Sequence, residues 1–562
     1  MKSILKSLIS VLSFLALLSA CGPGEPSPPA PISVMLTPNA ASVRVGESVQ
    51  FTATVHNSTN HAVTWSLSGA GCSGATCGAI SNTGLYTAPA RVPSPAVVTV
   101  KATSSADTSK SASATITILE AVVWTWVSGS NTAYQTGVYG TKGTPDPVNV
   151  PGARREAVSW LDSGGHFWLF GGDGLDSTGV YSSDAGELND LWRFDPTTSE
   201  WTWVSGSDIR FQSGTYGTKG TGDPSNVPGA RHWAVSWLDS SGNLWLFGGL
   251  GYDSAGNASV LNDLWKYDLT SSEWTWISGS NIRDQLPNYG TKGTADPSNV
   301  PGARQGAVSW FDPSGNLWLF GGLGVDSAGN WGWLNDLWRF DPATLDWTWV
   351  SGSNVGMQVG SYGTRNKPAP SNVPGSRVWA VSWPDSSGKL WLFGGLGYDS
   401  VGGGTLNDLW QFDTTTLTWT WVSGSSSNGQ AGAYGTKGIP SPSNVPGARQ
   451  QAATWIDSQR NLWLFGGDGY DSIPWVGQLN DLWKFDLNSL EWTWVAGSSS
   501  LAQRGPGIYG TKGTADPLNI PGGRYAAVSW FDSQGRFWLF GGAGVDATGG
   551  GGYLNDLWHC IR

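Results

Sequence analysis

A unit of about 73 residues recurs from Trp124 to the end of the chain. Its clearest markers are Trp-Thr-Trp triplets, which begin at Trp124, Trp201, Trp274, Trp347, Trp419 and Trp492. Between triplets, every unit carries Pro-Gly-x-Arg, an aromatic segment that ends in Gly-Gly, and Leu-Asn-Asp-Leu-Trp. Copies this similar at a fixed spacing are typical of one supersecondary unit that buries its apolar face against its neighbours. The repeat therefore constrains the architecture more than any other feature of the chain.

Each unit contains four short segments with the composition of strands. In the second full unit they are Arg231–Trp237, Asn243–Gly249, Leu261–Asp268 and Glu273–Ile277. Aromatic and branched residues fill these segments, and Gly, Asn, Asp and Ser lie between them. Two tight turns and two long loops would then connect the strands into a twisted antiparallel sheet.

At this point the chain resembles the kelch-repeat and galactose-oxidase-like β-propellers. The matching residues are the apolar run into Gly248 and Gly249, the segment Asn262–Asp268, and Trp274 six residues further on. All six units carry this pattern, over about three quarters of the chain. Kelch units usually have about 50 residues, and these are longer by some 23. The additional residues, which include Tyr-Gly-Thr-Lys-Gly, lie between the fourth strand of one unit and the first strand of the next.

The positions where the repeat begins and ends predict how the array closes. It opens with a lone fourth strand, Trp124–Val127, and stops after a third strand, Leu554–Trp558. A ring of six blades closes if the N-terminal strand completes the last blade, which hides strand edges that could pair with other chains. The predicted fold of residues 120–562 is thus an all-β, six-bladed kelch-type β-propeller closed by an N-terminal strand.

The N-terminal residues are typical of an export signal. Lys2 and Lys6 precede an apolar run, Leu8–Leu18, and Cys21 follows Leu-Ser-Ala. This arrangement resembles that of bacterial lipoproteins, which implies a signal peptide over residues 1–20 and lipidation of Cys21. No Asp follows the cysteine, so by the same resemblance we expect the outer membrane or cell surface rather than the inner membrane. Residues 21–31 are rich in Pro and Gly and are expected to form a tether.

A different pattern covers residues 32–119. Short runs with alternating apolar residues, such as Ser48–Val55 and Ala112–Ile118, are separated by Gly, Asn, Pro and Ser. The segment resembles the bacterial Ig-like domains, which implies a β-sandwich with Trp65 in its core. Cys72 and Cys77 lie five residues apart, and we expect a small-loop disulfide in an oxidising compartment. A spacer role is expected, and a direct binding role stays open.

The charge of the chain limits the kinds of ligand that it can bind. The formal net charge is −11 with a pI near 4.9, and Lys and Arg form no cluster, which argues against a nucleic-acid ligand.

Of 36 Trp residues, 30 recur at fixed strand positions and are expected in the core. Trp65 belongs to the N-terminal domain, and the remaining five stand at variable positions: Trp233, Trp331, Trp333, Trp379 and Trp475.

Variation inside the repeat points to a candidate site. The two residues after each Pro-Gly-x-Arg differ in every unit. They open the innermost strand, so we expect them at one end of the central channel, on the face that carries the long loops. Such divergence favours an asymmetric ligand, with drift at exposed positions as the alternative. The candidate ligand-binding residues are Arg155, Glu156, His232, Trp233, Gln305, Trp331, Trp333, Trp379, Gln450, Gln451, Trp475 and Tyr525.

Two sets of fixed residues have structural and functional interpretations. The arginines of Pro-Gly-x-Arg could form a cationic ring for an acidic ligand, or bond a neighbouring blade. An aspartate in each Gly-x-Asp loop could bind Ca²⁺ or cap a turn, and one carboxylate is far fewer than the oxygens that Ca²⁺ requires. The structural interpretation is favoured for both sets. The arginines are Arg154, Arg231, Arg304, Arg377, Arg449 and Arg524, and the aspartates are Asp176, Asp253, Asp326, Asp399, Asp471 and Asp546.

Catalysis remains the alternative to binding. The repeat region contains only His166, His232 and His559, and its sole cysteine, Cys560, occupies a strand position where Phe194 stands in the first unit. This set argues against the copper chemistry of galactose oxidase. A cofactor-free lyase, epimerase or hydrolase that uses Glu156, His232 and Arg155 stays open. The leading hypothesis is a monomeric, non-catalytic binding module for an extracellular glycan or protein, without metal or cofactor; a purely structural envelope protein is the third possibility.

Overall fold

The computed structural model describes residues 30–119, 122–179, 184–385, 387–501 and 505–561. The predicted signal peptide and Cys21 lie outside this part of the chain. The described residues form two compact units, which divide between Ile118 and Leu119. Nearly all regular structure is β, and none of the described helices has the length and apolar character needed to cross a membrane.

The N-terminal unit contains three small sheets. β1 (Ser33–Thr37) pairs with β4 (Thr52–His56). A four-stranded sheet has the order β2 (Ala40–Arg44), β9 (Ser111–Leu119), β8 (Val97–Ser104) and β5 (Val63–Ser68). A three-stranded sheet has the order β3 (Ser48–Gln50), β7 (Leu85–Thr87) and β6 (Ala79–Ile80). A 3₁₀ turn, η1 (Gly74–Cys77), precedes β6.

Alternating side chains build the core of this unit. Along β8, Val98, Val100 and Ala102 are fully buried, because successive side chains of a strand point to opposite faces. Trp65 packs against this core from β5 while remaining partly exposed. The expected disulfide between Cys72 and Cys77 is present.

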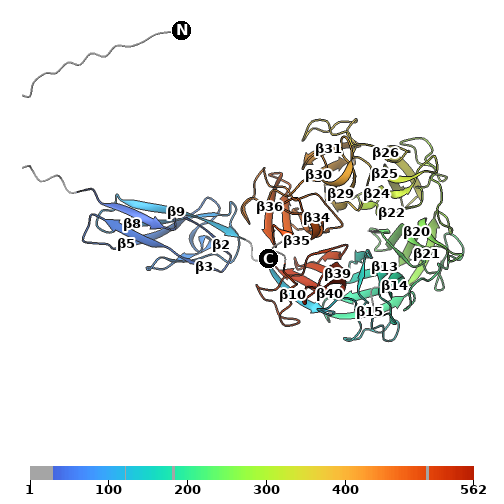
Figure 1. The fold of residues 1–562 in the computed structure, drawn as a ribbon, viewed down its shortest axis with the longest axis horizontal. Coiled ribbons are helices and arrows are strands. Elements are labelled where there is room, and N and C mark those ends of the chain that lie inside the picture. Colours follow the sequence, from blue (N-terminus) through green and yellow to red (C-terminus); the bar gives the residue numbers. More distant parts are fainter. Residues whose placement is uncertain (1–29, 120–121, 180–183, 386, 502–504, 562) are drawn as a thin grey trace, which may run out of the picture. The chain divides into compact units, whose positions relative to one another are not determined.

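Six equivalent sheets make up the C-terminal unit and surround a common axis (Figure 1). The first contains β11 (Arg154–Arg155), β12 (Val158–Leu161), β13 (Phe167–Gly174), β14 (Gly186–Asp195) and β15 (Glu200–Ser205). The second contains β16 (Gly222–Asp223), β17 (Arg231–His232), β18 (Val235–Leu238), β19 (Leu244–Tyr252), β20 (Ala258–Asp268) and β21 (Glu273–Ser278). The third contains β22 (Arg304–Gln305), β23 (Val308–Phe311), β24 (Leu317–Val325), β25 (Trp331–Asp341) and β26 (Asp346–Ser351).

The remaining sheets repeat this order. The fourth contains β27 (Arg377–Val378), β28 (Val381–Pro384), β29 (Lys389–Tyr398), β30 (Gly403–Asp413) and β31 (Thr418–Ser423). The fifth contains β32 (Arg449–Gln450), β33 (Ala453–Ile456), β34 (Leu462–Tyr470), β35 (Val476–Asp486) and β36 (Glu491–Ala496). The sixth contains β37 (Arg524–Tyr525), β38 (Val528–Phe531), β39 (Phe537–Val545), β40 (Gly551–Ile561) and β10 (Val123–Ser128). All strand pairs within these sheets are antiparallel.

The last sheet joins the two ends of the repeat, as the sequence predicts. β10 pairs with β40, with Trp124 opposite Cys560 and Trp126 opposite Trp558. Cys560 is buried in the core cluster beside Phe537, at the strand position that Phe194 occupies in the first sheet. The edge that β40 would expose is thereby covered by the start of the repeat.

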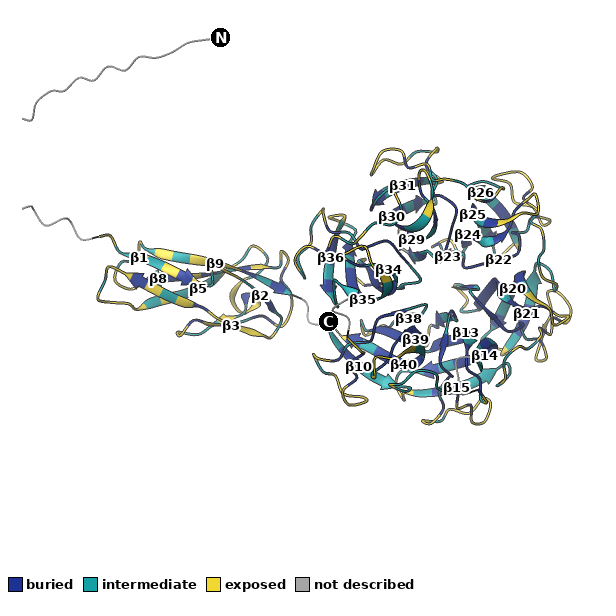
Figure 2. Ribbon diagram, in the orientation of Figure 1, coloured by how far each residue is buried: buried dark blue, intermediate teal, exposed yellow. Residues whose placement is uncertain are grey.

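Many residues of the propeller strands, including those of β13 and β14, are buried (Figure 2), and aromatic side chains pack between neighbouring sheets. One cluster combines Trp160 and Trp168 from the first sheet with Leu244, Trp265 and Trp274 from the second. The indole Nε1 of Trp160 also donates to the carbonyl oxygen of Trp245, at 3.2 Å. Because each cluster takes side chains from two sheets, no single unit can bury its own apolar surface.

The fixed arginines are structural. Arg154 is fully buried and donates through Nη1 and Nη2 to the two carboxylate oxygens of Asp190, at 2.7 Å each. The hypothesis of a cationic ring for an acidic ligand is therefore wrong. The partner is the aspartate of Leu-Asn-Asp in the same sheet, rather than a group in a neighbouring one. Equivalent pairs are Arg231–Asp263, Arg304–Asp336, Arg377–Asp408, Arg449–Asp481 and Arg524–Asp556.

The additional residues of each unit form a strap over the outer edge of a sheet. In the first sheet, the hydroxyl of Tyr139 donates to Asp190 at 2.8 Å, and Lys142 Nζ lies 4.2 Å from the ring centre of Trp203. Asp146 forms an isolated β-bridge with Trp201 on β15. The length beyond an ordinary kelch unit thus protects an edge strand.

The repeated loop aspartates cap turns. Oδ1 of Asp176 accepts the backbone N–H groups of Thr178 and Gly179, and its Oδ2 accepts the backbone N–H of Arg210. These hydrogen bonds lower the pKa of Asp176, against the effect of burial. The carboxylate oxygens are thus already engaged by the loop itself, as the favoured interpretation requires.

Candidate functional site

The innermost strand of every sheet is interrupted by one residue with positive φ. In the first sheet, β11 and β12 both pair with β13, and Glu156 between them has φ 62°. The paired strand must bulge in response: a β-carbon on Gly172 would lie 2.7 Å from the carbonyl oxygen of Arg155. A β-carbon on Gly171 would similarly lie 2.7 Å from the carbonyl oxygen of Arg231 in the next sheet. The repeated Gly-Gly therefore permits both the bulge and the close approach of neighbouring sheets.

The six interrupting residues form what we call the axial ring. They are Glu156, Trp233, Gly306, Trp379, Gln451 and Ala526. The backbone N–H of each donates to the carbonyl oxygen of the ring residue in the preceding sheet, with N···O distances of 2.8–3.1 Å. The sixth bond runs from Glu156 to Ala526 and completes a closed circle. The variable residues of the repeat are thus held on a rigid backbone ring at one end of the central channel.

The side chains of the axial ring meet in pairs across its two small residues. Trp233 and Trp379 lie on either side of Gly306, and their ring centroids are 5.1 Å apart. Gln451 and Glu156 lie on either side of Ala526, and Gln451 Nε2 donates to Glu156 Oε1 at 3.4 Å. A β-carbon on Gly306 would lie 2.7 Å from Cδ1 of Trp379, so the indole pair needs glycine at this position.

Below the axial ring, the channel is neutral. It is a cavity of about 250 Å³ lined by Ala157, Val158, Ser159 and the equivalent Ala, Val, Ser and Thr residues of the other five sheets. The hydroxyl of Ser236 donates to the carbonyl oxygen of Ser159 in the preceding sheet, and this contact recurs around the channel. The charged groups of the site are therefore confined to the ring and the residues beside it.

One guanidinium links the first and last sheets. Arg155 donates through Nε and Nη2 to Asp173 Oδ2, at 3.1 and 3.0 Å, and through Nη1 to the hydroxyl oxygen of Tyr525 at 3.1 Å. Its Cζ lies 4.9 Å from the ring centre of Tyr553, whose hydroxyl donates to Asp173 at 2.7 Å. Since these residues come from β11, β13, β37 and β40, the polar cluster depends on ring closure.

Glu156 and His232 lie beneath this cluster. His232 Nε2 is 3.9 Å from Glu156 Oε2, and Arg155 Nε is 3.4 Å from Glu156 Oε1. Burial raises the pKa of Glu156 to about 8, although Arg155 opposes this shift. The indole N–H of Trp233 also lowers the pKa of Glu156, although it does not form a hydrogen bond with the carboxyl group. Burial lowers the pKa of His232 to about 4. Both side chains are therefore uncharged near pH 7.

Residues missed by the sequence analysis complete the site. The residue between the glycines of Gly-Gly-x-Gly lies opposite the variable residue of the innermost strand, and is Asp173, Leu250, Leu323, Leu396, Asp468 or Ala543. The next strand places Glu187, Val260, Thr405, Gln478 and Tyr553 opposite these, together with Trp333, which was already a candidate from the sequence. Their variation between units was a signal in the sequence that could have identified them.

In each sheet, the three residues that lie opposite one another on neighbouring strands form a row. The six rows divide the face around the axis into two halves. In the first sheet the row is Arg155, Asp173 and Glu187, and the fifth and sixth sheets add Asp468 and two tyrosines. The second, third and fourth sheets instead place leucine in the middle of the row. A ligand on this face would meet polar and charged groups on one side of the axis and apolar groups on the other.

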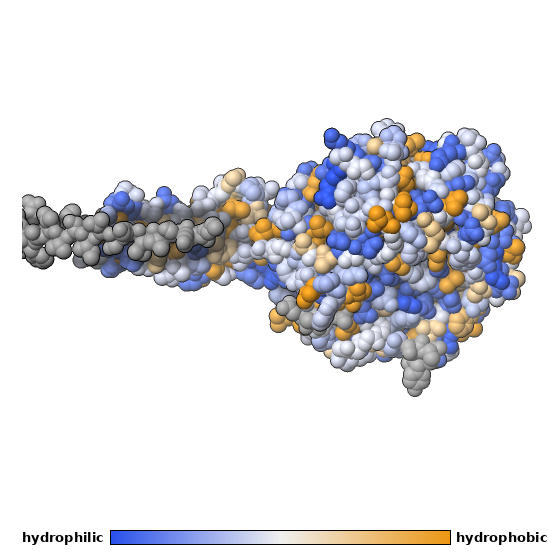
Figure 3. Space-filling model, turned by 45° about the horizontal axis from the view of Figure 1, so that its top comes forward, coloured by the Kyte–Doolittle hydropathy of each residue, from blue (hydrophilic) through white to orange (hydrophobic). Residues whose placement is uncertain are grey.

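The other three candidate tryptophans lie outside the axial ring. Trp331 opens β25 with 51% of its surface exposed, and Trp475, just before β35, is 59% exposed. Trp333 packs edge-on against Tyr398 of the next sheet, with centroids 5.5 Å apart. On the face of this unit that Figure 3 shows, hydrophobic residues are interspersed among hydrophilic ones. The structure thus brings together the candidates near the axis and leaves Trp331 and Trp475 at the loops.

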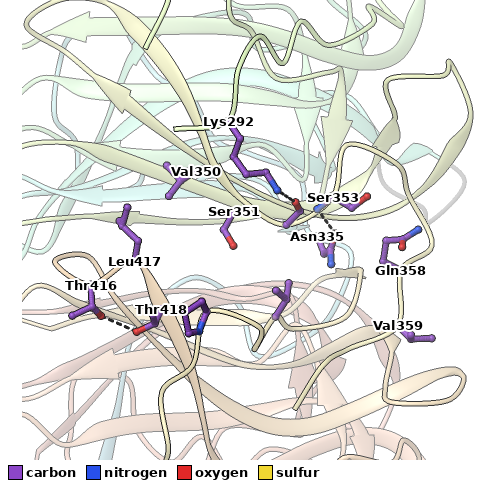
Figure 4. Close-up of a pocket in the computed structure, with 13 residues that line it drawn as sticks. Lys292, Asn335, Val350, Ser351, Ser353, Gln358, Val359, Thr416, Leu417 and Thr418 are labelled. Carbon is purple, nitrogen blue, oxygen red and sulfur yellow. Dashed lines mark hydrogen bonds between the residues drawn. The ribbon is translucent and has the colours of Figure 1, made fainter. Parts of the chain in front are cut away.

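Grooves also lie between neighbouring sheets at the outer rim. One, of about 410 Å³, is lined by Lys292, Asn335 and Ser353 on one side and by Thr416, Leu417 and Thr418 on the other (Figure 4). Lys292 Nζ donates to the carbonyl oxygen of Gly352 at 2.6 Å and lies 4.1 Å from the ring centre of Trp349. Because its polar groups serve the strap, this groove is part of the scaffold. Among the described residues, no group of three or more His, Cys, Asp or Glu side chains could hold a metal ion.

No family model matches the chain. A Kelch repeat-containing protein from Arthroderma benhamiae is 23% identical over 334 residues, which cover 56% of this chain and 46% of that protein. The multiple epidermal growth factor-like domains protein 8 of Homo sapiens is 34% identical over 107 residues, covering 19% of this chain and 3% of that protein. The chain therefore spans less than half the length of these curated relatives.

Solved structures are similar at lower identity. The structure of YjhT is 15% identical in sequence; the match covers 75% of this chain and 95% of that chain, with a TM-score of 0.41. A structural genomics protein of unknown function from Bacteroides thetaiotaomicron is 12% identical and covers 95% of this chain and 99% of its own, with a TM-score of 0.42. Together with six sheets of one topology, the kelch-repeat relative supports a β-propeller of the kelch type.

Proposed function

We propose that this protein is a non-catalytic binding module that holds an extracellular glycan or protein ligand on the long-loop face of a six-bladed kelch-type propeller. In this proposal, an export signal and lipidated Cys21 anchor the chain to the outer membrane or cell surface, and an Ig-like domain over residues 32–119 acts as a spacer. The propeller works as a monomer and requires no metal or cofactor.

The proposal rests on the positions at which the six units differ in sequence. The scaffold groups Arg154, Asp190, Tyr139 and their equivalents repeat their contacts from sheet to sheet, whereas no two sheets share the same combination of axial-ring residue and adjoining row. A ring of nearly identical units thus presents one asymmetric surface at one end of its axis. Loops and strand ends on a rigid scaffold are free to vary where they bind a ligand.

A cofactor-free carbohydrate-active enzyme is the second candidate. One observation favours it: Glu156 and His232, 3.9 Å apart, have pKa values shifted in opposite directions by burial. Near pH 7 the carboxyl would carry a proton and the imidazole would not, which suits a general acid and a general base. Arg155 beside them could then hold a developing negative charge.

A glycan array and an extract of cell-surface proteins test the proposal with the purified full chain. We expect a retained ligand that is lost in Arg155→Ala and weakened in the double variant Trp331→Ala and Trp475→Ala. Gln534→Ala, in the exposed turn between β38 and β39, is the matched control and should leave retention unchanged. Turnover of a retained glycan that disappears in Glu156→Gln would instead establish the enzyme. If a folded chain retains nothing, a structural role in the envelope replaces both.

A further inference from the structure

Six polar atoms around the axial ring have no hydrogen-bond partner within the described residues. They are Glu156 Oε2, His232 Nδ1, Trp233 Nε1, Gln305 Oε1, Trp379 Nε1 and Gln450 Oε1. Glu156, His232 and Gln305 are themselves only 6–7% exposed. Buried polar groups are nearly always hydrogen-bonded, because an unmade bond costs the full desolvation of the group. A concentration of such atoms at one place therefore calls for polar partners from outside the chain, which water or the hydroxyl groups of a ligand can supply.

Apart from four scattered atoms, Thr125 Oγ1, Arg193 Nε, Arg210 Nη1 and His559 Nδ1, the unpartnered atoms elsewhere in the propeller recur from sheet to sheet. Oδ1 of Asn149 and Nε1 of Trp201 lack partners, and so do the equivalent atoms in four other sheets. These positions belong to the copied scaffold. The axial atoms stand at positions that vary within the repeat, and four of the six belong to residues that contact one another through the pairs Trp233–Trp379, His232–Trp233 and His232–Glu156.

The site becomes more buried toward the axis. Side chains at its rim are partly exposed, with 24% for Arg155, 18% for Glu187 and 15% for Asp173. Beneath them, the side chains of His232 and Glu156 are 8% and 1% exposed. A ligand group that reaches Glu156 must therefore leave water and be small.

The unpartnered atoms define the chemistry of that group. The two indole N–H groups need an acceptor, whereas the Gln305 and Gln450 carbonyl oxygens and the Glu156 carboxyl can accept. A hydroxyl both donates and accepts, and two adjacent hydroxyls on a sugar ring can serve several of these atoms at once. An ammonium group has no acceptor to offer the indoles, and the indole faces suit the C–H side of a sugar.

Charge argues against an acidic ligand. Carboxylates of Asp173, Glu187 and Asp468 belong to the rows around the axis. The guanidinium of Arg155 is already engaged by Asp173. An anionic sugar would lose hydration on entering without gaining a free cation.

We propose that the axial ring is a subsite for one uncharged, hydroxyl-rich sugar residue at the end of a glycan, which lies over the ring and directs its hydroxyls toward Glu156 and the indole N–H groups of Trp233 and Trp379. This inference rests on the proposed binding function and narrows its ligand to neutral saccharides. The polar rows of the first, fifth and sixth sheets would then contact the following residues of the glycan.

The test compares immobilised oligosaccharides that end in a neutral hexose, a uronic acid or a hexosamine, each presented to the full chain. Retention of the neutral series is expected. Trp233→Phe and Trp379→Phe keep an aromatic ring and remove one donor, so each should bind about fivefold more weakly. Glu156→Leu keeps the volume and removes the carboxyl, and should weaken binding at least as much, whereas Gln534→Ala should have no effect.

The outcomes separate this inference from the function on which it rests. If Arg155→Ala abolishes retention while Trp233→Phe, Trp379→Phe and Glu156→Leu bind like the unmodified chain, the face binds a glycan and the axial subsite is wrong. Preference for the uronic acid or hexosamine series also overturns the subsite. If the chain retains none of the three series, both proposals fail for glycans.

Discussion

Trp233 and Trp379 face each other across Gly306, with ring centroids 5.1 Å apart, although they belong to different sheets. Their contact is possible because the residue between them in the axial ring has no side chain. On the opposite side of the ring, Ala526 leaves similar room for Glu156 and Gln451. The differences between units are therefore coordinated, and the asymmetry of the site is a property of the complete ring.

Gly306→Ala should be destabilising. Its φ of 61° disfavours a side chain, and the new β-carbon would lie 2.6–2.8 Å from atoms of Val378 and Trp379. We expect a loss of about 1–3 kcal/mol in the free energy of unfolding. Ala526→Gly at the equivalent ring position, with φ 55°, is the matched control and should be neutral or slightly stabilising. Urea titration of both variants measures the difference, and equal stabilities would contradict the packing described for Trp379.

Breaking one buried ion pair should cost far more than breaking an exposed one. Arg304→Met leaves Asp336 buried without its bidentate partner, so a loss of about 3–5 kcal/mol is expected. Arg283→Met removes the pair with Asp284, in which the arginine side chain is 44% exposed, and should change stability by about 1 kcal/mol or less. Thermal unfolding compares the two. Similar midpoints would mean that the buried arginines contribute little to the scaffold.

Glu156→Gln should become relatively more stable as the pH rises from 6.5 to 8. Burial raises the pKa of Glu156 to about 8 from an ordinary 4.5, so the folded chain keeps a proton that the unfolded chain has already lost. Stability contributed by Glu156 therefore falls with rising pH and levels off above about 8. Over this interval the free energy of unfolding of Glu156→Gln, relative to that of the unmodified chain, should rise by about 2 kcal/mol. Unfolding midpoints of both chains, determined at each pH, measure this difference.

The same measurement has an internal control at lower pH. Burial lowers the pKa of His232 to about 4 from 6.5, so its contribution is lost as the pH falls below 6.5 and does not change above it. Arg155, Asp173 and Gln451, which surround Glu156, are the same in both chains. A constant difference in unfolding midpoint between pH 6.5 and 8 would show that the carboxyl ionises normally in the folded state.

Removing the N-terminal strand should open the ring. A chain that begins at Gly129 lacks β10, which exposes the edge of β40 and removes Trp124 from the core beside Trp558 and Cys560. We expect a lower unfolding midpoint and concentration-dependent association through the free edge. Size-exclusion chromatography with light scattering follows the association. A chain starting at Val122 is the control and should remain monomeric, and equal behaviour of the two would mean that β10 is dispensable.

The architecture could be predicted because its cause is local and repeated. The strand segments of the second unit and the disulfide between Cys72 and Cys77 follow from short-range patterns, and the pairing of Trp124 with the final unit follows from the phase of the repeat; the structure confirms all three. The strap could not be anticipated as an edge cover, because its contacts join Tyr139 to Asp190, which lie in different parts of the unit. The role of Asp173 was missed because it follows from strand register opposite Arg155.

The sequence by itself determined which residues are scaffold and which vary, since copied units keep the groups that pack every sheet and change only where packing does not require them. It also determined that both ends of the repeat belong to one sheet. Only the tertiary structure decided how Glu156, His232 and the Trp233–Trp379 pair contact one another in one partly buried site, and that Trp331 and Trp475 lie outside it. The physical reason is that this site forms when six strands from six units close a ring of backbone hydrogen bonds around one axis, a contact that no single unit encodes.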